Sequence, residues 1–265
     1  MSSSHENGFN AGGESASTPH IAIWLTEPSA PAVEMGYLAG YDTVVLDIEH
    51  GFFDLRELDA IIPFIRAKGM RVIAKVLGPE RGPIQQALDF GADAVAIPHI
   101  TSAAQAAEIC GFAKFPPLGD RSFAGGRTSN YRGFTDEWVS AQDNTTHCYP
   151  MIEDGSAFDE IDAILALPVV DGIFIGPSDL SLRRDRGAYA ATDADLADIR
   201  HLARAANTAG KPWVLPAWTE SEQKLALAEG AHTIVAVMQF GAMLNGFTAT
   251  RENLRQIQTE MASAR

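Results

Sequence analysis

The sequence has little cysteine. Only Cys110 and Cys148 occur among its 265 residues, and no pairing motif surrounds them. This scarcity argues against a disulfide-stabilised secreted domain and fits a reducing compartment, with both thiols serving as small buried side chains. We therefore expect a cytoplasmic protein.

Positive charge is scarce as well. The chain carries 20 lysines and arginines against 34 aspartates and glutamates, which gives a formal net charge of -14 and a pI near 4.8. Nucleic acids and anionic membrane surfaces bind positively charged faces, so we expect neither as a partner. An anionic small molecule would need a metal ion, a local cation or main-chain amides to hold it.

Long apolar runs are also missing. No stretch approaches the length of a transmembrane helix, and residues 1–18 lack the basic and apolar regions of a secretory signal. Residues 1–19, rich in Ser, Gly, Asn and Glu, predict a disordered or loosely attached tail. The hydrophobic fraction of 46% is enough for residues 20–265 to bury one large core as a single domain.

Short apolar runs alternate with amphipathic stretches through that domain. The predicted strands are residues 21–25, 43–46, 72–75, 94–97, 148–152, 172–175, 213–215 and 233–237. The predicted helices are residues 30–39, 55–68, 81–90, 103–114, 158–166, 194–209, 221–229 and 242–261. About eight strand–helix units with nearly continuous apolar strands favour an α/β fold of the (β/α)8 TIM barrel type over an open doubly wound sheet. No Gly-x-Gly-x-x-Gly follows the first strand, which disfavours a dinucleotide-binding domain.

An acid follows each of two consecutive predicted strands, Glu153 after one and Asp179 after the next. A parallel crossover brings both strand ends to the same edge of a sheet, so these carboxylates should share a pocket. Paired carboxylates suit a hard divalent cation such as Mg2+ or Mn2+. The alternative is that Glu153 is only an acid at a helix N-terminus and Asp179 only an N-cap.

A histidine and two more acids follow the second strand, in Asp47-Ile48-Glu49-His50. Histidine transfers protons near neutral pH, and a neighbouring carboxylate can orient its ring. We take His50 as the candidate general base and Asp47 as its orienting partner. Glu49 should also point into the site, toward a water at the metal or a neighbouring network. The alternative is a capped loop with a buried histidine.

Lys75 is the cation at the end of the third strand, and His99 follows the fourth. Lys75 could stabilise an enolate or bind a carboxylate, and burial could also make it a Schiff-base nucleophile. His99 is either a substrate or supporting contact or a hydrogen-bonded histidine at the barrel edge.

Small residues and apolar side chains complete the predicted site. The turn from Gly176 lets the main-chain N–H groups of Ser178 and Asp179 approach a substrate carboxylate. After the seventh strand, residues 216–218 offer apolar walls, with Trp218 as a substrate contact.

One long connection, residues 115–146, is rich in Gly, Arg, Ser and Asn. A connection of this length in a barrel more often has a function or contacts another subunit than serves only to join two elements. Arg121 and Arg127 within it are possible anion contacts, and the alternative is that they are solvated or interface arginines.

Four ordered motifs resemble those of the HpcH/HpaI family of class II, metal-dependent pyruvate aldolases. They are Leu46-Asp-Ile-Glu-His-Gly51, the run from Gln86 to Pro98, Met151-Ile-Glu153, and the run from Val170 to Leu180. The resemblance covers roughly residues 20–257.

This resemblance implies a (β/α)8 barrel whose last helix is exchanged with a neighbouring subunit, usually in a homohexamer arranged as a trimer of dimers. It implies a divalent metal, Mg2+, Mn2+ or Co2+, held by Glu153 and Asp179, and a catalytic dyad of His50 and Asp47. It also implies reversible cleavage of 4-hydroxy-2-oxo acids to pyruvate and an aldehyde, with oxaloacetate decarboxylation in some members.

One position departs from the family pattern. Lys75 stands where the family has an enolate-stabilising arginine, so the charge is kept but the bidentate fork is lost. Other functions stay open. They are a lyase that acts on a CoA thioester or a carboxyphosphate-type acid on the same barrel, a Schiff-base aldolase that uses Lys75, and, given the substitution at Lys75, a non-catalytic barrel that binds oxo acids.

Overall fold

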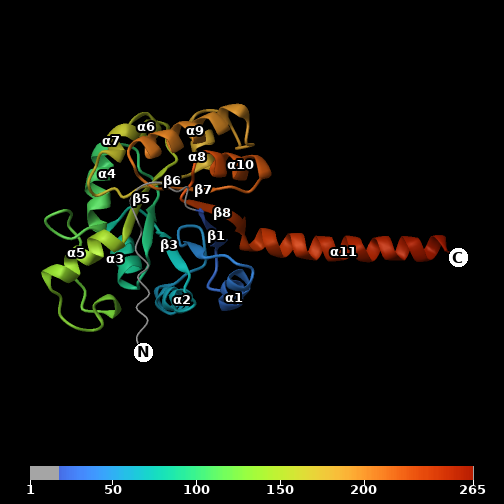
Figure 1. Ribbon diagram of the computed structural model, residues 1–265, viewed down its shortest axis with the longest axis horizontal. Coiled ribbons are helices and arrows are strands. Elements are labelled where there is room, and N and C mark those ends of the chain that lie inside the picture. Colours follow the sequence, from blue (N-terminus) through green and yellow to red (C-terminus); the bar gives the residue numbers. More distant parts are fainter. Residues whose placement is uncertain (1–17, 265) are drawn as a thin grey trace.

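The protein forms a closed barrel of eight parallel strands surrounded by helices (Figure 1). A computed structural model describes residues 18–264, so residues 1–17 of the predicted tail lie outside the described residues. The strands are β1 His20–Leu25, β2 Thr43–Asp47, β3 Arg71–Lys75, β4 Ala94–Ile97, β5 His147–Ile152, β6 Ile173–Ile175, β7 Trp213–Pro216 and β8 Thr233–Met238. Each strand pairs with the next in parallel, and β8 closes the barrel on β1. The predicted (β/α)8 TIM barrel is confirmed.

Helices follow the strands around the outside of the barrel. The α-helices are α1 Ala30–Leu38, α2 Leu55–Ala67, α3 Arg81–Asp89, α4 Ala103–Cys110, α5 Asp136–Thr145, α6 Gly155–Asp159, α7 Ile161–Leu165, α8 Pro177–Arg183, α9 Asp193–Thr208, α10 Glu220–Ala228 and α11 Gln239–Ser263. Two short 3-10 helices, η1 Gly111–Ala113 and η2 Arg127–Ser129, lie in the long connection between β4 and β5.

Local signals in the sequence define many of the helix ends. The hydroxyl of Ser102 accepts from the N–H of Gln105 at the start of α4, and Thr219 forms a capping box with Glu222 at the start of α10. Gly91 and Gly230 have φ of +102° and +76° where a helix gives way to the next strand, a conformation that glycine adopts without steric cost.

Three helical segments differ from the prediction. The predicted helix over residues 158–166 is two short helices, α6 and α7. Helix α8 occupies a segment that the sequence indicated as a turn, because Pro177 stands at its first position, where proline needs no N–H donor. Helix α5, capped by Thr135, lies within a connection for which no helix was predicted.

The hydrophobic core has two layers. Alternate strand residues point into the barrel, where Trp24, Tyr149 and Phe174 are the large side chains. The remaining apolar side chains pack between the strands and the helices. Each fully buried aliphatic or aromatic side chain contributes roughly 1.5–3 kcal/mol to folding. This core fixes the positions of the strand ends, which carry the side chains of the candidate active site.

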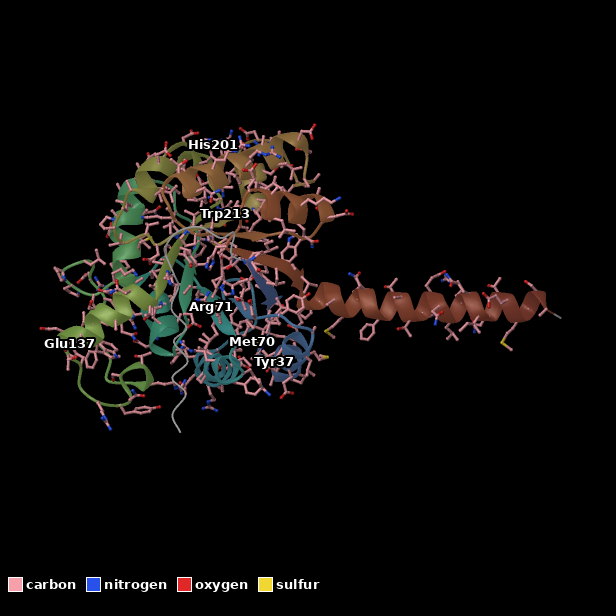
Figure 2. The ribbon with its side chains drawn as sticks, viewed as in Figure 1. Tyr37, Met70, Arg71, Glu137, His201 and Trp213 are labelled. Carbon is pink, nitrogen blue, oxygen red and sulfur yellow. The ribbon has the colours of Figure 1, made fainter. Side chains whose placement is uncertain are left out.

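The last helix leaves the barrel. Helix α11 has 25 residues, and its beginning packs against β1 and β8, where the Gln239 Nε2 donates to Glu27 Oε1 at 2.7 Å. Beyond that point it extends away from the barrel with its side chains exposed (Figure 1, Figure 2). Among residues 18–264, no helix is both long and apolar enough to cross a membrane.

Candidate active site

A cavity of about 180 Å³ opens at the C-terminal ends of the barrel strands. Barrel enzymes place their chemistry at this edge, because the loops that follow the strands converge there. The lining residues are Trp24, Asp47, His50, Lys75, Met151, Glu153, Phe174, Gly176, Pro177, Ser178, Asp179, Tyr189, Pro216, Trp218, Glu222 and Met238.

The structure brings Glu153 and Asp179 to this cavity together. Glu153 directly follows β5, and Asp179 lies in the first turn of α8, just beyond the neighbouring strand β6. Glu153 is only 4% exposed. Burial raises the pKa of its carboxyl group, and the charges of Asp179 and Glu49 raise it further, although the N–H of His99 opposes the increase. The site thus concentrates negative charge, and the basic group nearest to Glu153 in residues 18–264 is the His99 ring, whose Nδ1 lies 3.6 Å from Glu153 Oε1.

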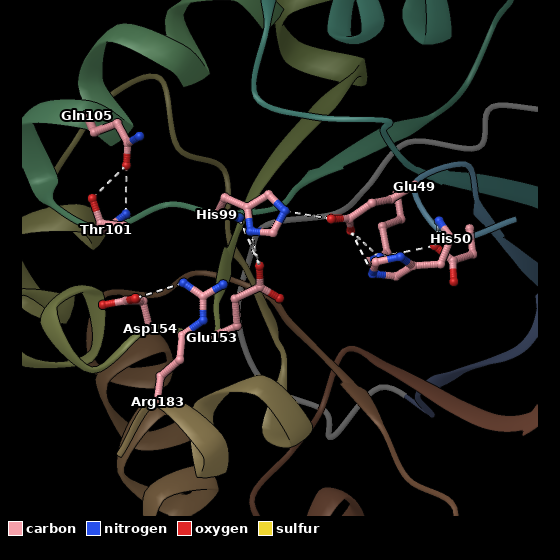
Figure 3. A network of polar contacts seen from close by, with 10 residues as sticks. Glu49, His50, His99, Thr101, Gln105, Glu153, Asp154 and Arg183 are labelled. Carbon is pink, nitrogen blue, oxygen red and sulfur yellow. Dashed lines mark hydrogen bonds and ion pairs between the residues drawn. The ribbon is translucent and has the colours of Figure 1, made fainter. Parts of the chain in front are cut away.

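These two carboxylates suit a divalent cation. Within residues 18–264, no lysine or arginine forms an ion pair with either of them, and the nearby Arg183 pairs with Asp154 at 2.9 Å instead (Figure 3). A hard cation would neutralise them and would accept their oxygens as ligands. In the described part of the chain, no cluster of three or more His, Cys, Asp or Glu side chains is arranged to hold a metal. Any ion bound by the pair would therefore take further ligands from substrate and water.

Gly176 leaves the space that Glu153 occupies. A Cβ atom at this position would lie 2.8 Å from the Cβ of Glu153 and 3.0 Å from its Oε2. Helix capping does not explain the two acids, since Asp154 is the residue that caps α6 and Gly176 is the N-cap position of α8.

Lys75 lies almost fully buried between two acids. It is the last residue of β3, it is 4% exposed, and its Nζ donates to Asp47 Oδ1 at 3.1 Å and to Glu49 Oε2. These two ion pairs hold the Lys75 Nζ at the cavity wall.

The predicted role of Asp47 as orienter of the His50 ring does not match the geometry. Its carboxylate accepts hydrogen bonds from Lys75, from the Trp24 Nε1 at 3.1 Å and from the main-chain N–H of His50 at 3.2 Å. The ring of His50 instead has its Nε2 3.5 Å from Glu49 Oε2. Asp47 therefore fixes the loop that carries His50, and Glu49 is the carboxylate beside the ring.

His99 connects the two acidic parts of the site (Figure 3). Its Nε2 lies 2.6 Å from Glu49 Oε1, and its main-chain N–H donates to Glu153 Oε1 at 2.8 Å. His99 makes these contacts with a φ of +62°, an uncommon conformation for a residue other than glycine. Burial opposes ionisation of Glu49, but Lys75, His50 and His99 together lower its pKa.

Apolar side chains line the opposite part of the cavity. Trp24 packs edge-on against Phe174, with ring centroids 5.9 Å apart, and against Trp218 at 6.2 Å. Trp218 is 41% exposed and stands above the barrel end with Pro216 and Met238. The structure thus places Trp218 where the sequence predicted an apolar wall.

The arginines of the long connection lie away from the cavity, contrary to prediction. Arg127 binds α2 through its Nη2, which donates to Asp59 Oδ1 at 3.0 Å. The side chain of Arg121 is fully buried against Phe115 and pairs with Asp89 at 2.9 Å. Both guanidinium groups anchor the connection to neighbouring helices, and the structure places neither beside the substrate.

Several cavity residues carry no sequence signal of their own. Trp24 and Met151 are interior residues of strands, and only the barrel register shows that they form the floor of the site. Tyr189 and Glu222 come from segments far apart in the chain, and the Tyr189 hydroxyl donates to Glu222 Oε1 at 2.6 Å. The alternation of inward and outward side chains along β1 could have identified Trp24 as a residue that faces the barrel interior. Nothing in the local sequence indicated the Tyr189–Glu222 pair.

Comparison with known proteins identifies a family. The family model described as HpcH/HpaI aldolase/citrate lyase matches residues 20–239. A 2-dehydro-3,6-dideoxy-6-sulfogluconate aldolase of Pseudomonas putida is 32% identical over 61% of this chain and 63% of its own length. A 2-keto-3-deoxy-L-rhamnonate aldolase of Klebsiella pneumoniae is 30% identical over 81% of this chain and 80% of its own length.

Solved structures share the fold. The HpcH/HpaI aldolase of Desulfitobacterium hafniense DCB-2 superposes with a TM-score of 0.80, covers 91% of this chain and 93% of its own, and is 24% identical. The similarity at this identity concerns the barrel architecture.

Proposed function

The chain belongs to the HpcH/HpaI aldolase/citrate lyase family, and on this premise we propose that it is a metal-dependent aldolase. The reaction is the reversible cleavage of a 4-hydroxy-2-oxo acid to pyruvate and an aldehyde. The observation that carries the proposal is the pair Glu153 and Asp179, two carboxylates that line one cavity and that no lysine or arginine among the described residues pairs with. The family and the named relatives are aldolases, which supports the reaction class.

Glu153 and Asp179 are the residues that would hold a divalent cation, Mg2+, Mn2+ or Co2+. When bound, such an ion supplies a Lewis acid that stabilises negative charge on a substrate oxo group. A citrate lyase β subunit of the same fold is described with oxaloacetate and magnesium, which is consistent with this choice of ion.

The substrate carboxylate would lie against the first turn of α8. Ser178 and Asp179 are exposed there, and N–H groups in a first helical turn have no partner within their own helix. Lys75, fixed by Asp47 and Glu49, places a positive charge at the cavity wall that offsets charge on the enolate oxygen.

His50 is the proposed base. Its side chain is 68% exposed and lines the cavity, so it can reach the 4-hydroxyl group of a bound substrate. Removal of that proton lets the carbon–carbon bond break, with the electron pair passing to the oxo-acid fragment and the hydroxyl carbon leaving as the aldehyde. Oxaloacetate decarboxylation, as a side activity, would form the same enolate and release CO2 in place of the aldehyde.

The geometry disfavours a Schiff-base mechanism at Lys75. A nucleophilic lysine needs a free amine aimed at the substrate, whereas the Nζ of Lys75 is engaged by the carboxylates of Asp47 and Glu49. We expect no covalent adduct when the protein is treated with pyruvate and borohydride.

The cavity also disfavours a CoA-thioester lyase. Among its lining residues, Lys75 is the only lysine or arginine, and it is already paired. The phosphates of CoA would find no cation there. A purely binding role for oxo acids would not require a histidine at the cavity mouth, and turnover assays with pyruvate and simple aldehydes separate it from catalysis.

We also propose that α11 packs against a neighbouring subunit. Its exposed apolar side chains recur at spacings of three, four and seven residues, which places them on one stripe of the helix. They are Phe240, Met243, Leu244, Phe247, Leu254, Ile257 and Met261. Such a stripe needs a partner, and helix exchange within a homohexamer built as a trimer of dimers would supply one.

The direct test is pyruvate release from a synthetic 4-hydroxy-2-oxo acid by metal-loaded protein. We expect turnover that EDTA abolishes and that Mg2+, Mn2+ or Co2+ restores. The substitution Glu153→Gln should abolish turnover. The neighbouring substitution Asp154→Asn should retain turnover, because asparagine can still cap α6. Full turnover in EDTA would reject the proposal.

A further inference from the structure

The cavity has a polar half, in which Met151 and Phe174 of β5 and β6 are also apolar, and a second half that is mainly apolar. Asp47, Lys75, Glu153 and Asp179 come from β2, β3 and the segments after β5 and β6. The contiguous strands β7, β8 and β1 supply the other half. It consists of Pro216, Met238 and Trp24, with Trp218 just beyond β7.

The polar atoms bordering the apolar half are already paired within the protein. The Nε1 of Trp24 donates to Asp47 Oδ2 at 3.1 Å, and the Tyr189 hydroxyl donates to Glu222 Oε1. The other oxygen of Glu222 accepts from the N–H and the hydroxyl of Thr219, each at 2.7 Å. Glu222 is fully buried, so these groups do not offer free hydrogen-bonding positions to a hydroxylated ligand.

The cavity also lacks a cation for a distal anion. Lys75 is the only lysine or arginine among its lining residues, and it lies in the polar half, where Asp47 and Glu49 hold its Nζ. The lining acids would repel a second carboxylate, a sulfonate or a phosphate placed beyond the oxo-acid end.

We infer that the aldehyde released at this site carries a short, uncharged, apolar chain that lies against Trp24, Trp218 and Met238. This inference rests on the proposed aldolase function and names its substrate class. The exposed part of Trp218 offers the chain an apolar surface beside the oxo-acid end of the cavity.

The first test measures kcat/KM for addition of pyruvate to acetaldehyde, propanal and butanal, referred to the unhydrated aldehyde. We expect a rise of about threefold to fourfold for each added methylene, the factor that burial of one methylene provides. A flat or falling series would overturn the inference.

Matched pairs test the charge and hydroxyl arguments. Butanal and succinic semialdehyde share four carbons, and propanal and glyceraldehyde share three. We expect kcat/KM to be at least tenfold higher for butanal than for succinic semialdehyde, and higher for propanal than for glyceraldehyde. The carboxylate of succinic semialdehyde and the hydroxyl groups of glyceraldehyde would lose their water without gaining a partner in the apolar half. Preference for the charged or hydroxylated member would overturn the inference.

Substitution of the apolar wall supplies a gain-of-function test. Trp218→Arg places a cation beside the proposed chain, and we expect the ratio of kcat/KM for succinic semialdehyde to that for butanal to increase at least tenfold. Leu227→Arg, which adds the same charge at an exposed position of α10 outside the cavity, should leave the ratio unchanged. Equal ratios in both variants would count against the inference.

Exchange of the pyruvate methyl protons with D2O separates this inference from the proposed function, since the exchange needs no aldehyde. If exchange occurs but the aldehyde preference is reversed, the substrate class is wrong and the aldolase proposal stands. If neither exchange nor cleavage occurs, the aldolase proposal itself fails.

Discussion

Lys75 and Asp47 form an ion pair of 3.1 Å across the ends of two adjacent strands. They are register partners, each the last residue of its strand, and they are 4% and 5% exposed. A buried pair of this kind links the stability of the barrel end to the charge of the site, because removal of one partner leaves the other buried and unpaired.

Replacement of Lys75 by Met should therefore reduce both stability and turnover. We expect the free energy of unfolding to fall by about 3–5 kcal/mol, since Asp47 and Glu49 lose their shared cation. Urea denaturation followed by circular dichroism measures the change. In the double variant Asp47→Asn/Lys75→Met the loss should be smaller than the sum of the two single losses, and strict additivity would show that the pair is not coupled.

Replacement of His50 by Asn should separate two reactions. Cleavage of a hydroxy-oxo acid requires removal of a hydroxyl proton, so we expect its kcat to decrease about 10²- to 10⁴-fold. Decarboxylation of oxaloacetate has no such proton to remove, and it should be affected much less. Phe52→Ala, at an exposed position on the same loop, is the control. An equal loss in both reactions would mean that His50 acts in binding or folding.

Acid should destabilise the barrel through His147. Burial, with the charges of Lys114 and Arg71, lowers the pKa of this histidine to about 3. An unfolded chain takes up a proton near pH 6.5, whereas the folded protein takes it up only near pH 3. Stability is therefore greatest above pH 6.5 and decreases as the pH falls, by about 2 kcal/mol between pH 7 and pH 5.

The unfolding free energy of His147→Gln should depend less on pH over this range. His201→Gln, an exposed position on α9, is the matched control and should keep the wild-type dependence. Chemical denaturation at pH 5, 6 and 7 measures both slopes. Identical slopes in the two variants would exclude His147 as the source.

Charge on the apolar stripe of α11 should disrupt assembly. Phe247 and Leu254 are 69% and 50% exposed and lie on one side of the helix. We expect the variant Phe247→Glu/Leu254→Glu to elute as a smaller species than wild type in light-scattering chromatography. Gln256→Glu, on the opposite side of α11, should not change the mass. A monomeric wild-type protein would contradict the exchange proposal.

The strands and the acids at their ends could be predicted from the sequence because both are local features. Apolar runs of three to six residues and glycine turns mark the strands, and a parallel barrel brings every strand end to one edge. This reasoning placed Glu153, Asp179, His50 and Lys75 at one cavity.

Side-chain partners could not be predicted in the same way. Asp47 turns to Lys75 and Trp24 because of register across three strands, which no local pattern encodes. Arg127 looked like an anion ligand, but its length lets it reach Asp59 on α2. His99 bridges the site with a left-handed backbone, and nothing in the sequence indicated that conformation.

The most direct measurement of the central claim is the exchange of pyruvate methyl protons in D2O, followed by NMR, with protein stripped of metal and then reloaded. The account predicts no exchange in the stripped protein, recovery with Mg2+ or Mn2+, and no recovery in Glu153→Gln or Asp179→Asn. Exchange at the full rate after chelation, or undiminished in both variants, would contradict the claim that these two carboxylates hold the ion on which the reaction depends.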